Sequence, residues 1–530
     1  MDIITENSKD NKPIIKIKTP QREIYLSSRY HPLQEAEKIS NNISIKTPYF
    51  LIIGLGNPYL IFSISKKNTE KEIIVIEPSE EIFNTILSNN YLSKMVSSHN
   101  IKLKIIKTEE ELKNLLSSIS YFEYYINPQY KTIFTFISTW EEIIKKTIQN
   151  LEINRNTLKR FGNVWAKNLI LSLNYITLTK GIKEFYDVFK NINAIVIGAG
   201  PSLDNNLEEL RELYNSFLII SVDTSWGYLS SQGIKPDIVI TVDPQLKNFI
   251  YNLTSKDYKT TLFVCDTLYP PLIYKHIPIS NILNFDSPLK VWQTIKEIYN
   301  LEKGTIEVGG SVVCSAIDLA YKLGANKVLL VGVDLGYPNQ KIYSKNNYYE
   351  LNNFVNSNIF LPYDPYNILS KYPIVEKISN NGSKILTDPR MITFKNWIEN
   401  YITTTNISII NLSPNGLQIN NTQHIPINAL PKKNIRDEIE KIKSSIIEKT
   451  NPHTNINITK DIVETIKKVI DEYNKKGIFE STTIIENNIL AKNLFEIALQ
   501  DILLDDYNED QFLKELSNRI RYFEKVLKYL

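Results

Sequence analysis

The chain has 530 residues, 42% of them hydrophobic and 22% charged, and its formal net charge at pH 7 is +3. Length and composition are those of a folded protein of about three domains, and so small a net charge excludes the basic footprint of a nucleic-acid-binding protein. No apolar run approaches the roughly 20 residues of a membrane span, and the N-terminus lacks the apolar core of a signal peptide. The 2 cysteines and 5 histidines lack the spacing of a disulfide framework or a zinc site. We therefore expect a cytoplasmic protein without a membrane span.

Residues 1–150 predict a small α/β domain of the Rossmann type. Tyr49–Ile53 and Glu72–Ile76 are apolar runs typical of buried strands, and they are followed by Gly54–Pro58 and by Glu77. A GxG after one strand, with an acid after the next about 20 residues on, is the pattern that binds a nucleotide and its ribose. The pattern also resembles the adenosylmethionine motif of methyltransferases.

Two residues of this loop disfavour a bound cofactor. Pro58 and Tyr59 occupy space that the cofactor would need, and no third glycine follows. We therefore interpret the N-terminal domain as a vestigial or purely structural nucleotide fold.

The central domain, residues 151–430, begins with a predicted amphipathic helix, Thr157–Ile176, and then turns to α/β sequence. The apolar run Ala194–Ile197 stops at Gly198-Ala199-Gly200-Pro201-Ser202, and a helix is predicted next. A strand, a glycine turn and a helix commonly open the binding crevice of a parallel sheet, where helix N–H groups meet a phosphate. The turn is not a P-loop, and Leu203 replaces the third glycine of a dinucleotide site. A purely structural turn is the alternative.

Aspartates follow the later strands of this domain. Five successive apolar runs end at Asp223, Asp243, Asp266, Asp286 and Asp334. The carboxyl ends of parallel strands share one edge of a sheet, so we expect a polar pocket there. Each aspartate alone is equally typical of an Asx turn or a helix N-cap.

A second helix start with free N–H groups is predicted at Gly309-Gly310-Ser311, which favours a phosphate or carboxylate ligand over an ordinary N-cap. After Asp334, residues 336–372 are rich in tyrosine and asparagine, and they predict either a lid or a disordered insertion. Thr387-Asp388-Pro389 predicts a helix start. Residues 431–530 shift to Glu, Lys and Ile with helical spacing and predict an all-helical C-terminal domain.

Several of these segments resemble the Maf proteins, motility-associated factors that glycosylate flagellin in some flagellated bacteria. The segments are SSRYHPLQEAEKI and IEPSEEIFNTIL in the N-terminal domain, TLKRFGNVWAKNLI in the linker helix, and AIVIGAGPSLD, SVDTSWGYL, KPDIVITVDP, GGSVVCSAIDLA and KVLLVGVDL in the central domain. The central segments are also similar to bacterial sialyltransferases and to archaeal 6-hydroxymethylpterin pyrophosphokinases.

The resemblance implies an α/β fold with a central Rossmann-like, modified GT-A domain and a mainly parallel sheet. It implies a protein O-glycosyltransferase that transfers a nonulosonic acid of the pseudaminic, legionaminic or sialic type from a CMP-activated donor to Ser or Thr of flagellin. Which nonulosonic acid, which flagellin residues and which oligomeric state are left open. The resemblance implies that Gly198–Ser202, Asp223 and Gly309–Ser311 hold the donor. The full set of donor-binding residues that we expect is Gly198, Gly200, Pro201, Ser202, Asp223, Thr224, Gly309, Gly310, Ser311, Asp334, Tyr337 and Thr387.

The catalytic base is where the chain departs from the sialyltransferases. Those enzymes place a histidine before a Ser-Lys…Thr-Asp helix start, whereas Asn381-Gly382 precede Ser383-Lys384 here, and His424 lies far beyond. A carboxylate near an oxocarbenium-like state can stabilise the cation and take the acceptor's proton. We assign that role to Asp243, with Asp223 as the second candidate. No metal ligands are assigned; either Mg²⁺ offsets the carboxylates, or they bind sugar hydroxyls.

Two other functions stay open. An ATP- and Mg²⁺-dependent enzyme like the pterin pyrophosphokinases would use the same aspartates, although those enzymes lack the terminal regions of this chain. A non-catalytic flagellin-binding or export factor would explain the missing histidine.

Overall fold

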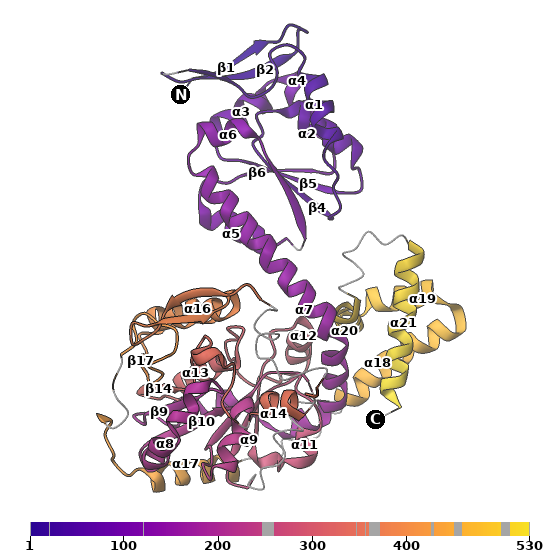
Figure 1. The fold of residues 1–530 in the computed structure, drawn as a ribbon. Helices are drawn as coiled ribbons and strands as arrows, with labels where there is room; N and C mark the ends of the chain where they lie inside the picture. Colours follow the sequence, from indigo (N-terminus) through magenta and orange to yellow (C-terminus); the bar gives the residue numbers. More distant parts are fainter. Residues whose placement is uncertain are drawn as a thin grey trace. The chain divides into compact units, whose positions relative to one another are not determined.

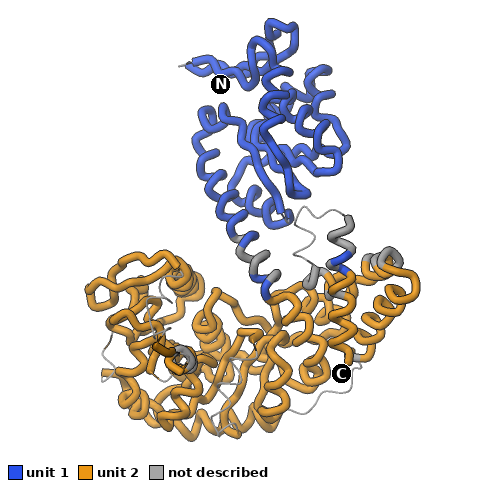
Figure 2. Tube along the Cα trace, turned by 45° about the vertical axis from the view of Figure 1, so that its right-hand side comes forward, with its two compact units in different colours: residues 1–160, 498–516 blue, residues 161–497, 517–530 orange. Residues whose placement is uncertain are grey.

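The computed structural model describes residues 2–20, 22–119, 121–245, 259–345, 347–355, 357–359, 372–423, 425, 429–449, 458–499 and 509–528. The chain forms two compact units, residues 1–160 with 498–516 and residues 161–497 with 517–530 (Figure 2). Helix α7 (Ile137–Leu178) runs unbroken through residue 150, where we placed the first domain boundary. The three-domain division itself stays a prediction.

The first unit is a small α/β fold. Its four-stranded sheet is parallel throughout, in the order β6-β5-β4-β7, and three more strands form an antiparallel meander, β1-β2-β3. The strands are β1 (Asp2–Asn7), β2 (Pro13–Lys18), β3 (Glu23–Tyr25), β4 (Tyr49–Ile53), β5 (Glu72–Glu77), β6 (Ile101–Ile105) and β7 (Phe122–Ile126). The helices are α1 (Pro32–Asn41), α2 (Pro58–Lys67), α3 (Glu80–Ser88), α4 (Asn90–Met95), α5 (Glu109–Ser117) and α6 (Pro128–Ile133).

The second unit is built on an eight-stranded sheet in the order β17-β14-β9-β10-β11-β12-β13-β8, and every pair in it is parallel (Figure 1). Its strands are β8 (Lys180–Gly181), β9 (Ala194–Ile197), β10 (Leu218–Val222), β11 (Ile238–Thr241), β12 (Leu262–Asp266), β13 (Ile282–Phe285), β14 (Lys327–Val331) and β17 (Ser408–Asn411). A two-stranded hairpin of β15 (Val375–Ile378) and β16 (Lys384–Thr387) lies outside this sheet. The α/β class with a mainly parallel central sheet is confirmed.

The apolar strands of this sheet are buried on both faces, as expected for parallel strands covered by helices. Because side chains alternate along a strand, Ala194 and Val196 of β9 enter one core cluster, whereas Ile195 and Ile197 enter the other. The first cluster contains α13 (Val312–Lys322), α16 (Pro389–Thr405) and α17 (Arg436–Glu448); the second contains α8 (Leu207–Leu213) and α9 (Asp223–Ser231).

Helix α17 begins the region predicted as the C-terminal domain, but it packs on the central sheet. Ile439 and Ile446 belong to the core of that sheet. The helices beyond it are α18 (Ile458–Lys476), α19 (Ile478–Asn487), α20 (Ile489–Leu499) and α21 (Glu509–Leu527), and the remaining helices of the second unit are α11 (Ile273–His276), α12 (Lys290–Tyr299) and α14 (Tyr348–Val355). Among the described residues, no helix is both long and apolar enough to cross a membrane.

Candidate functional site

The strand order of the central sheet reverses at β9, and a crevice is expected at the carboxyl end of that strand. The chain leaves β9 toward β10 on one side and returns later to β14 on the other, and ligands of open α/β sheets bind at such a reversal. The loops after β9 and β14 meet directly: Gly198 N donates to Val331 O at 2.8 Å, and Gly200 N donates to Gly332 O at 2.8 Å. The predicted glycine turn is present, but these two N–H groups are bonded within the protein.

The side of Gly200 that we expected to face a phosphate is filled by Asp334. A Cβ atom at Gly200 would lie 2.3 Å from Asp334 Oδ2, and Ser202 N donates to the same oxygen at 2.9 Å. The carboxylate of Asp334 therefore occupies the position that we predicted for an external anion. Glycine is required here by the close approach of two loops.

The other oxygen of Asp334 is buried without a hydrogen-bond partner among the described residues. Asp334 is 2% exposed, and its Oδ1 has no hydrogen-bond partner among the described residues. Burial raises the pKa of this carboxyl group to about 6. A buried acceptor without a donor is costly, so a hydroxyl or a protonated group of a ligand would satisfy it.

Of the two predicted anion sites at helix starts, the one at Gly309–Ser311 keeps N–H groups without an acceptor among the described residues. Ser311 caps α13 by accepting from Val313 N at 3.4 Å, and Gly310 is exposed with φ of 84°. The N–H groups of residues 309–312 find no acceptor among the described residues. The rings of Trp397 and Phe394 pack behind the two glycines. A helix of this length with unbonded N–H groups attracts an anion.

The two candidate catalytic acids follow adjacent strands. Asp223, at the end of β10, is 3% exposed; its Oδ2 accepts from Thr241 Oγ1 at 2.7 Å, and its Oδ1 accepts from Thr224 N at 2.7 Å. Burial, together with the smaller effect of the Asp243 charge, raises the pKa of Asp223 to about 6. Asp243, after β11, is half-buried and accepts from Gln245 N at 2.9 Å. Asp243 is thus the better placed of the two to meet a substrate.

The next two strand-end aspartates have structural roles. Asp266 Oδ1 accepts from Leu268 N at 2.7 Å and forms the turn that we predicted. Asp286 binds Trp292 Nε1 at 2.7 Å and Lys296 Nζ at 3.3 Å. Burial raises the pKa of Asp266 to about 7. The alternative interpretation as a turn therefore holds for Asp266, whereas Asp286 joins the end of β13 to α12 and to Lys303 N.

Tyr337 and Thr387 fix the loop after β14 to the hairpin β15–β16. Thr387 Oγ1 donates to Leu335 O at 2.8 Å. The Tyr337 hydroxyl donates to Asp388, which caps α16 and pairs with Arg390 at 2.7 Å. Burial alone would raise the pKa of Asp388, but the hydrogen bonds from Arg390 and Tyr337 outweigh it and keep that pKa below its ordinary value. Tyr337 and Thr387, both predicted to bind the donor, therefore hold the loop after β14 in position.

Sequence reasoning missed three polar residues, Ser413, Asn380 and Ser344, that contact the loop after β9 or one another. Ser413, after β17, contacts Ser202 through their hydroxyl oxygens at 3.0 Å, and Asn380 Nδ2 donates to Ser413 O at 2.8 Å. Ser344 N donates to the carbonyl of Ala199 at 2.9 Å. The available signal was the turn SPNG after the last apolar run of the domain. Asn381 and Gly382, which precede Ser383-Lys384, lie in the turn between β15 and β16, and His424 lies outside the described residues.

The GxG loop of the first unit is closed by its own side chains. Glu77 Oε2 accepts from Leu55 N at 2.9 Å and from the Tyr130 hydroxyl, and that hydroxyl accepts from Gly56 N at 2.9 Å. A Cβ at Gly56 would lie 2.2 Å from Leu26 Cδ1. The acid in the ribose position is therefore used internally, which supports a structural role for this loop. Among the described residues, no group of three or more His, Cys, Asp or Glu could hold a metal ion.

A family model and two relatives match parts of this chain. Residues 167–340 match the family model described as "MptE-like: 6-hydroxymethylpterin diphosphokinase MptE-like". An uncharacterized protein of Treponema pallidum (strain Nichols) is 31% identical over 133 residues, which are 24% of this chain and 59% of the relative. A second uncharacterized protein of that organism is 22% identical over 199 residues, 36% of this chain and 68% of the relative.

A solved structure matches nearly the whole chain. The Maf glycosyltransferase from Magnetospirillum magneticum AMB-1 superposes with a TM-score of 0.62 over 99% of this chain and 93% of that chain, at 12% identity. The chain has the fold of a Maf glycosyltransferase. The sialyltransferase CstII from Campylobacter jejuni, in complex with CMP-3FNeuAc, matches 45% of this chain and 89% of its own at 19% identity. Its TM-score is 0.25, too low to carry an argument.

Proposed function

We propose that this protein is an O-glycosyltransferase that transfers a nonulosonic acid from a CMP-activated donor to Ser or Thr of flagellin. The observation that carries the proposal is the match of the entire fold, both units included, to a Maf glycosyltransferase. The motifs Gly198–Ser202, Lys235–Pro244 and Gly309–Ala320, which resemble that family, lie in the central unit. The donor class and the acceptor follow from the same resemblance.

Two kinds of protein group suit different parts of the donor. The unbonded N–H groups at the start of α13 favour the donor's phosphate or carboxylate, and Ser311 adds a hydroxyl there. Asp334 Oδ1, buried without a partner, favours a hydroxyl of the nucleoside. This arrangement favours sugar hydroxyls over Mg²⁺ as the partners of the strand-end carboxylates.

We assign the chemical step to Asp243. As the bond from the anomeric carbon to CMP lengthens, positive charge develops on the sugar, and a carboxylate nearby stabilises it. The same carboxylate takes the proton of the Ser or Thr hydroxyl that attacks the anomeric carbon. Asp223 is buried behind it with both oxygens hydrogen-bonded, so we assign it a positioning role through Thr224 and Thr241.

The experiment compares flagellin from cells that contain this protein with flagellin from cells that lack it. We expect intact-mass analysis to show flagellin heavier by whole nonulosonic acid residues only when the protein is present. Equal masses in both cells would exclude the enzyme and favour a flagellin-binding or export factor.

A second function is favoured by the family model over residues 167–340. An MptE-like enzyme would consume ATP with a 6-hydroxymethylpterin and Mg²⁺ and release AMP. Incubation of the purified chain with these substrates decides between the two: we expect no AMP above the blank without pterin. Pterin-dependent AMP release would replace the glycosyltransferase proposal.

A further inference from the structure

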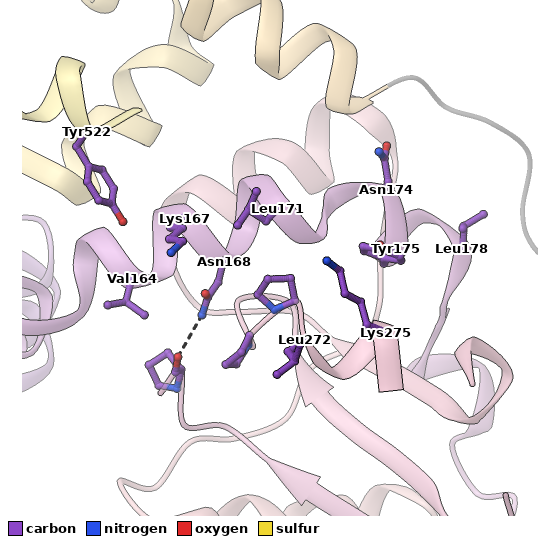
Figure 3. A pocket seen from close by; sticks show the side chains of 13 residues that line it. Val164, Lys167, Asn168, Leu171, Asn174, Tyr175, Leu178, Leu272, Lys275 and Tyr522 are labelled. Atoms are coloured by element: carbon purple, nitrogen blue, oxygen red, sulfur yellow. Dashed lines mark hydrogen bonds between the residues drawn. The ribbon is translucent and has the colours of Figure 1, made fainter. Parts of the chain in front are cut away.

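The second unit contains a cavity of about 730 Å³ beside the proposed catalytic acid (Figure 3). It lies between α7 and the loops that follow β11 and β12, and the hydroxyl-bearing ring of Tyr522 on α21 lines it as well. Pro244, the residue after Asp243, forms part of its wall. The volume falls within the range of about 300–1,000 Å³ that is usual for binding pockets.

Hydrogen bonds and a ring stack join the helix wall of the pocket to the loops. Asn168 Nδ2 on α7 donates to Pro244 O at 3.2 Å and to Leu268 O at 3.0 Å, so one amide ties the helix to both loops. Tyr175 stacks on Tyr274 with ring centroids 5.2 Å apart and planes 2° apart. Asn168 Oδ1 makes no hydrogen bond with the described residues, and it remains as an acceptor on the pocket wall. A backbone N–H is the donor that suits it.

The charged side chains among the described residues that line the pocket are both lysines. Lys167 and Lys275 line it, and none of the described residues that line it is acidic. The Lys275 ammonium group points into the cavity, and its side chain has no hydrogen bond or ion pair with a described residue. Leu171, Leu272 and three prolines supply the apolar part of the wall. The lining therefore suits a carboxylate flanked by apolar groups.

We propose that this pocket holds the acceptor polypeptide, and that Lys167 and Lys275 bind an acidic side chain near the modified Ser or Thr. The inference rests on the proposed function and adds the recognition of the acceptor. Strands lie about 4.8 Å apart, so the end of β12 lies about 14 Å from the end of β9, where the donor crevice opens. Asp243 follows β11, the strand before β12 in the sheet order, and an acceptor hydroxyl must meet the donor between the two strand ends.

The test uses the full-length protein and measures two affinities for each variant. Fluorescently labelled, unmodified flagellin is titrated with the protein, and CMP is titrated by calorimetry. The double variant Lys167→Glu/Lys275→Glu reverses the charge of the pocket. The control Lys327→Glu reverses an exposed lysine at the amino end of β14, on the opposite edge of the sheet. All three side chains are exposed, so we expect melting temperatures close to that of the unaltered protein.

We expect the double variant to weaken flagellin binding by at least about tenfold, because two attractive charges become repulsive, while its affinity for CMP stays unchanged. The control should change neither affinity. Unchanged flagellin binding in the double variant, or no binding by the unaltered protein, would overturn the pocket assignment, and so would a loss confined to CMP. Lysine-dependent flagellin binding without sugar transfer would instead refute the enzyme proposal alone.

Discussion

At the scale of single residues, two aspartates at equivalent strand ends have opposite surroundings. Asp243 is half-buried and precedes Pro244 of the pocket wall, whereas Asp266 is buried and bonded to its own turn. We predict that Asp243→Asn lowers the transfer rate by about 10²–10⁴-fold, the usual loss for a missing general base. The amide oxygen still accepts from Gln245 N, so folding should be retained.

Asp266→Asn is the matched control. Its carboxyl group has a pKa raised to about 7 by burial, and an amide oxygen can still accept from Leu268 N, so the neutral substitution should leave transfer nearly intact. The rates are measured as CMP release in the presence of flagellin. Full activity of folded Asp243→Asn would move the search for the base to Asp223.

Glu77 gives the first unit a predictable pH dependence. Burial raises its folded-state pKa to about 7, above an ordinary value near 4.5, so the folded state binds the proton more tightly than the unfolded state. Protonated Glu77 therefore contributes to the free energy of unfolding. This contribution, roughly 3 kcal/mol, is complete below pH 4.5 and is lost as the pH rises to about 7. Amide hydrogen exchange of β4 and β5 at pH 5 and pH 8 measures it. Glu77→Gln should flatten this dependence, and an equally steep dependence in the variant would contradict the assignment.

At the scale of elements, α17 is fixed to the central sheet by a buried ion cluster. Asp237 is 0% exposed and pairs with Arg436 at 2.8 Å and with Lys443 at 2.9 Å. We predict that Asp237→Ala destabilises the protein by about 3–5 kcal/mol, because Arg436 and Lys443 lose their buried carboxylate partner and keep, among the described residues, only the exposed carboxylate of Glu440. Urea unfolding measures the change.

The paired control for this cluster is Glu440→Ala. Glu440 contacts Lys443 at 3.1 Å, but its side chain is 42% exposed. An exposed pair contributes about 0–1 kcal/mol, so this variant should unfold close to the unaltered protein. Equal effects of the two substitutions would show that Asp237 does not anchor the helix.

The contacts of the GxG loop in the first unit disfavour nucleotide binding. Glu77, Tyr130 and Leu26 use the hydrogen bonds and the space that a nucleotide would need. We predict no thermal shift with millimolar adenosylmethionine. A saturable stabilisation of several degrees would contradict the structural interpretation.

Much of the element order was predictable from sequence, because the strands of a parallel sheet are short apolar runs. The runs at β4, β9 and β13 coincide with the observed strands, and the start of α16 after Asp388 is observed as well. Strands β6 and β7 were not predicted, since IKLKI and FEYYI mix polar and apolar residues. The packing of α17 on the sheet was also missed, because it depends on Asp237, which is about 200 residues distant in sequence.

At the scale of the whole molecule, the site was predictable only in outline. Sequence placed the glycine turn and the strand-end aspartates at one edge, and the parallel sheet confirms that edge. It could not show that Asp334 fills the space beside Gly200, because that contact joins loops about 130 residues apart. Nor could it show the cavity between α7 and the loops after β11 and β12, whose wall depends on Asn168.

The central claim is that this chain transfers a sugar from a CMP-activated nonulosonic acid to flagellin. The most direct measurement combines the purified protein, the donor and unmodified flagellin, and follows flagellin by intact-mass spectrometry. We predict stepwise mass gains of one sugar residue each, with stoichiometric release of CMP and with neither change in the Asp243→Asn variant. Flagellin of unchanged mass, in a reaction where the unaltered protein binds both the donor and flagellin, would contradict the account.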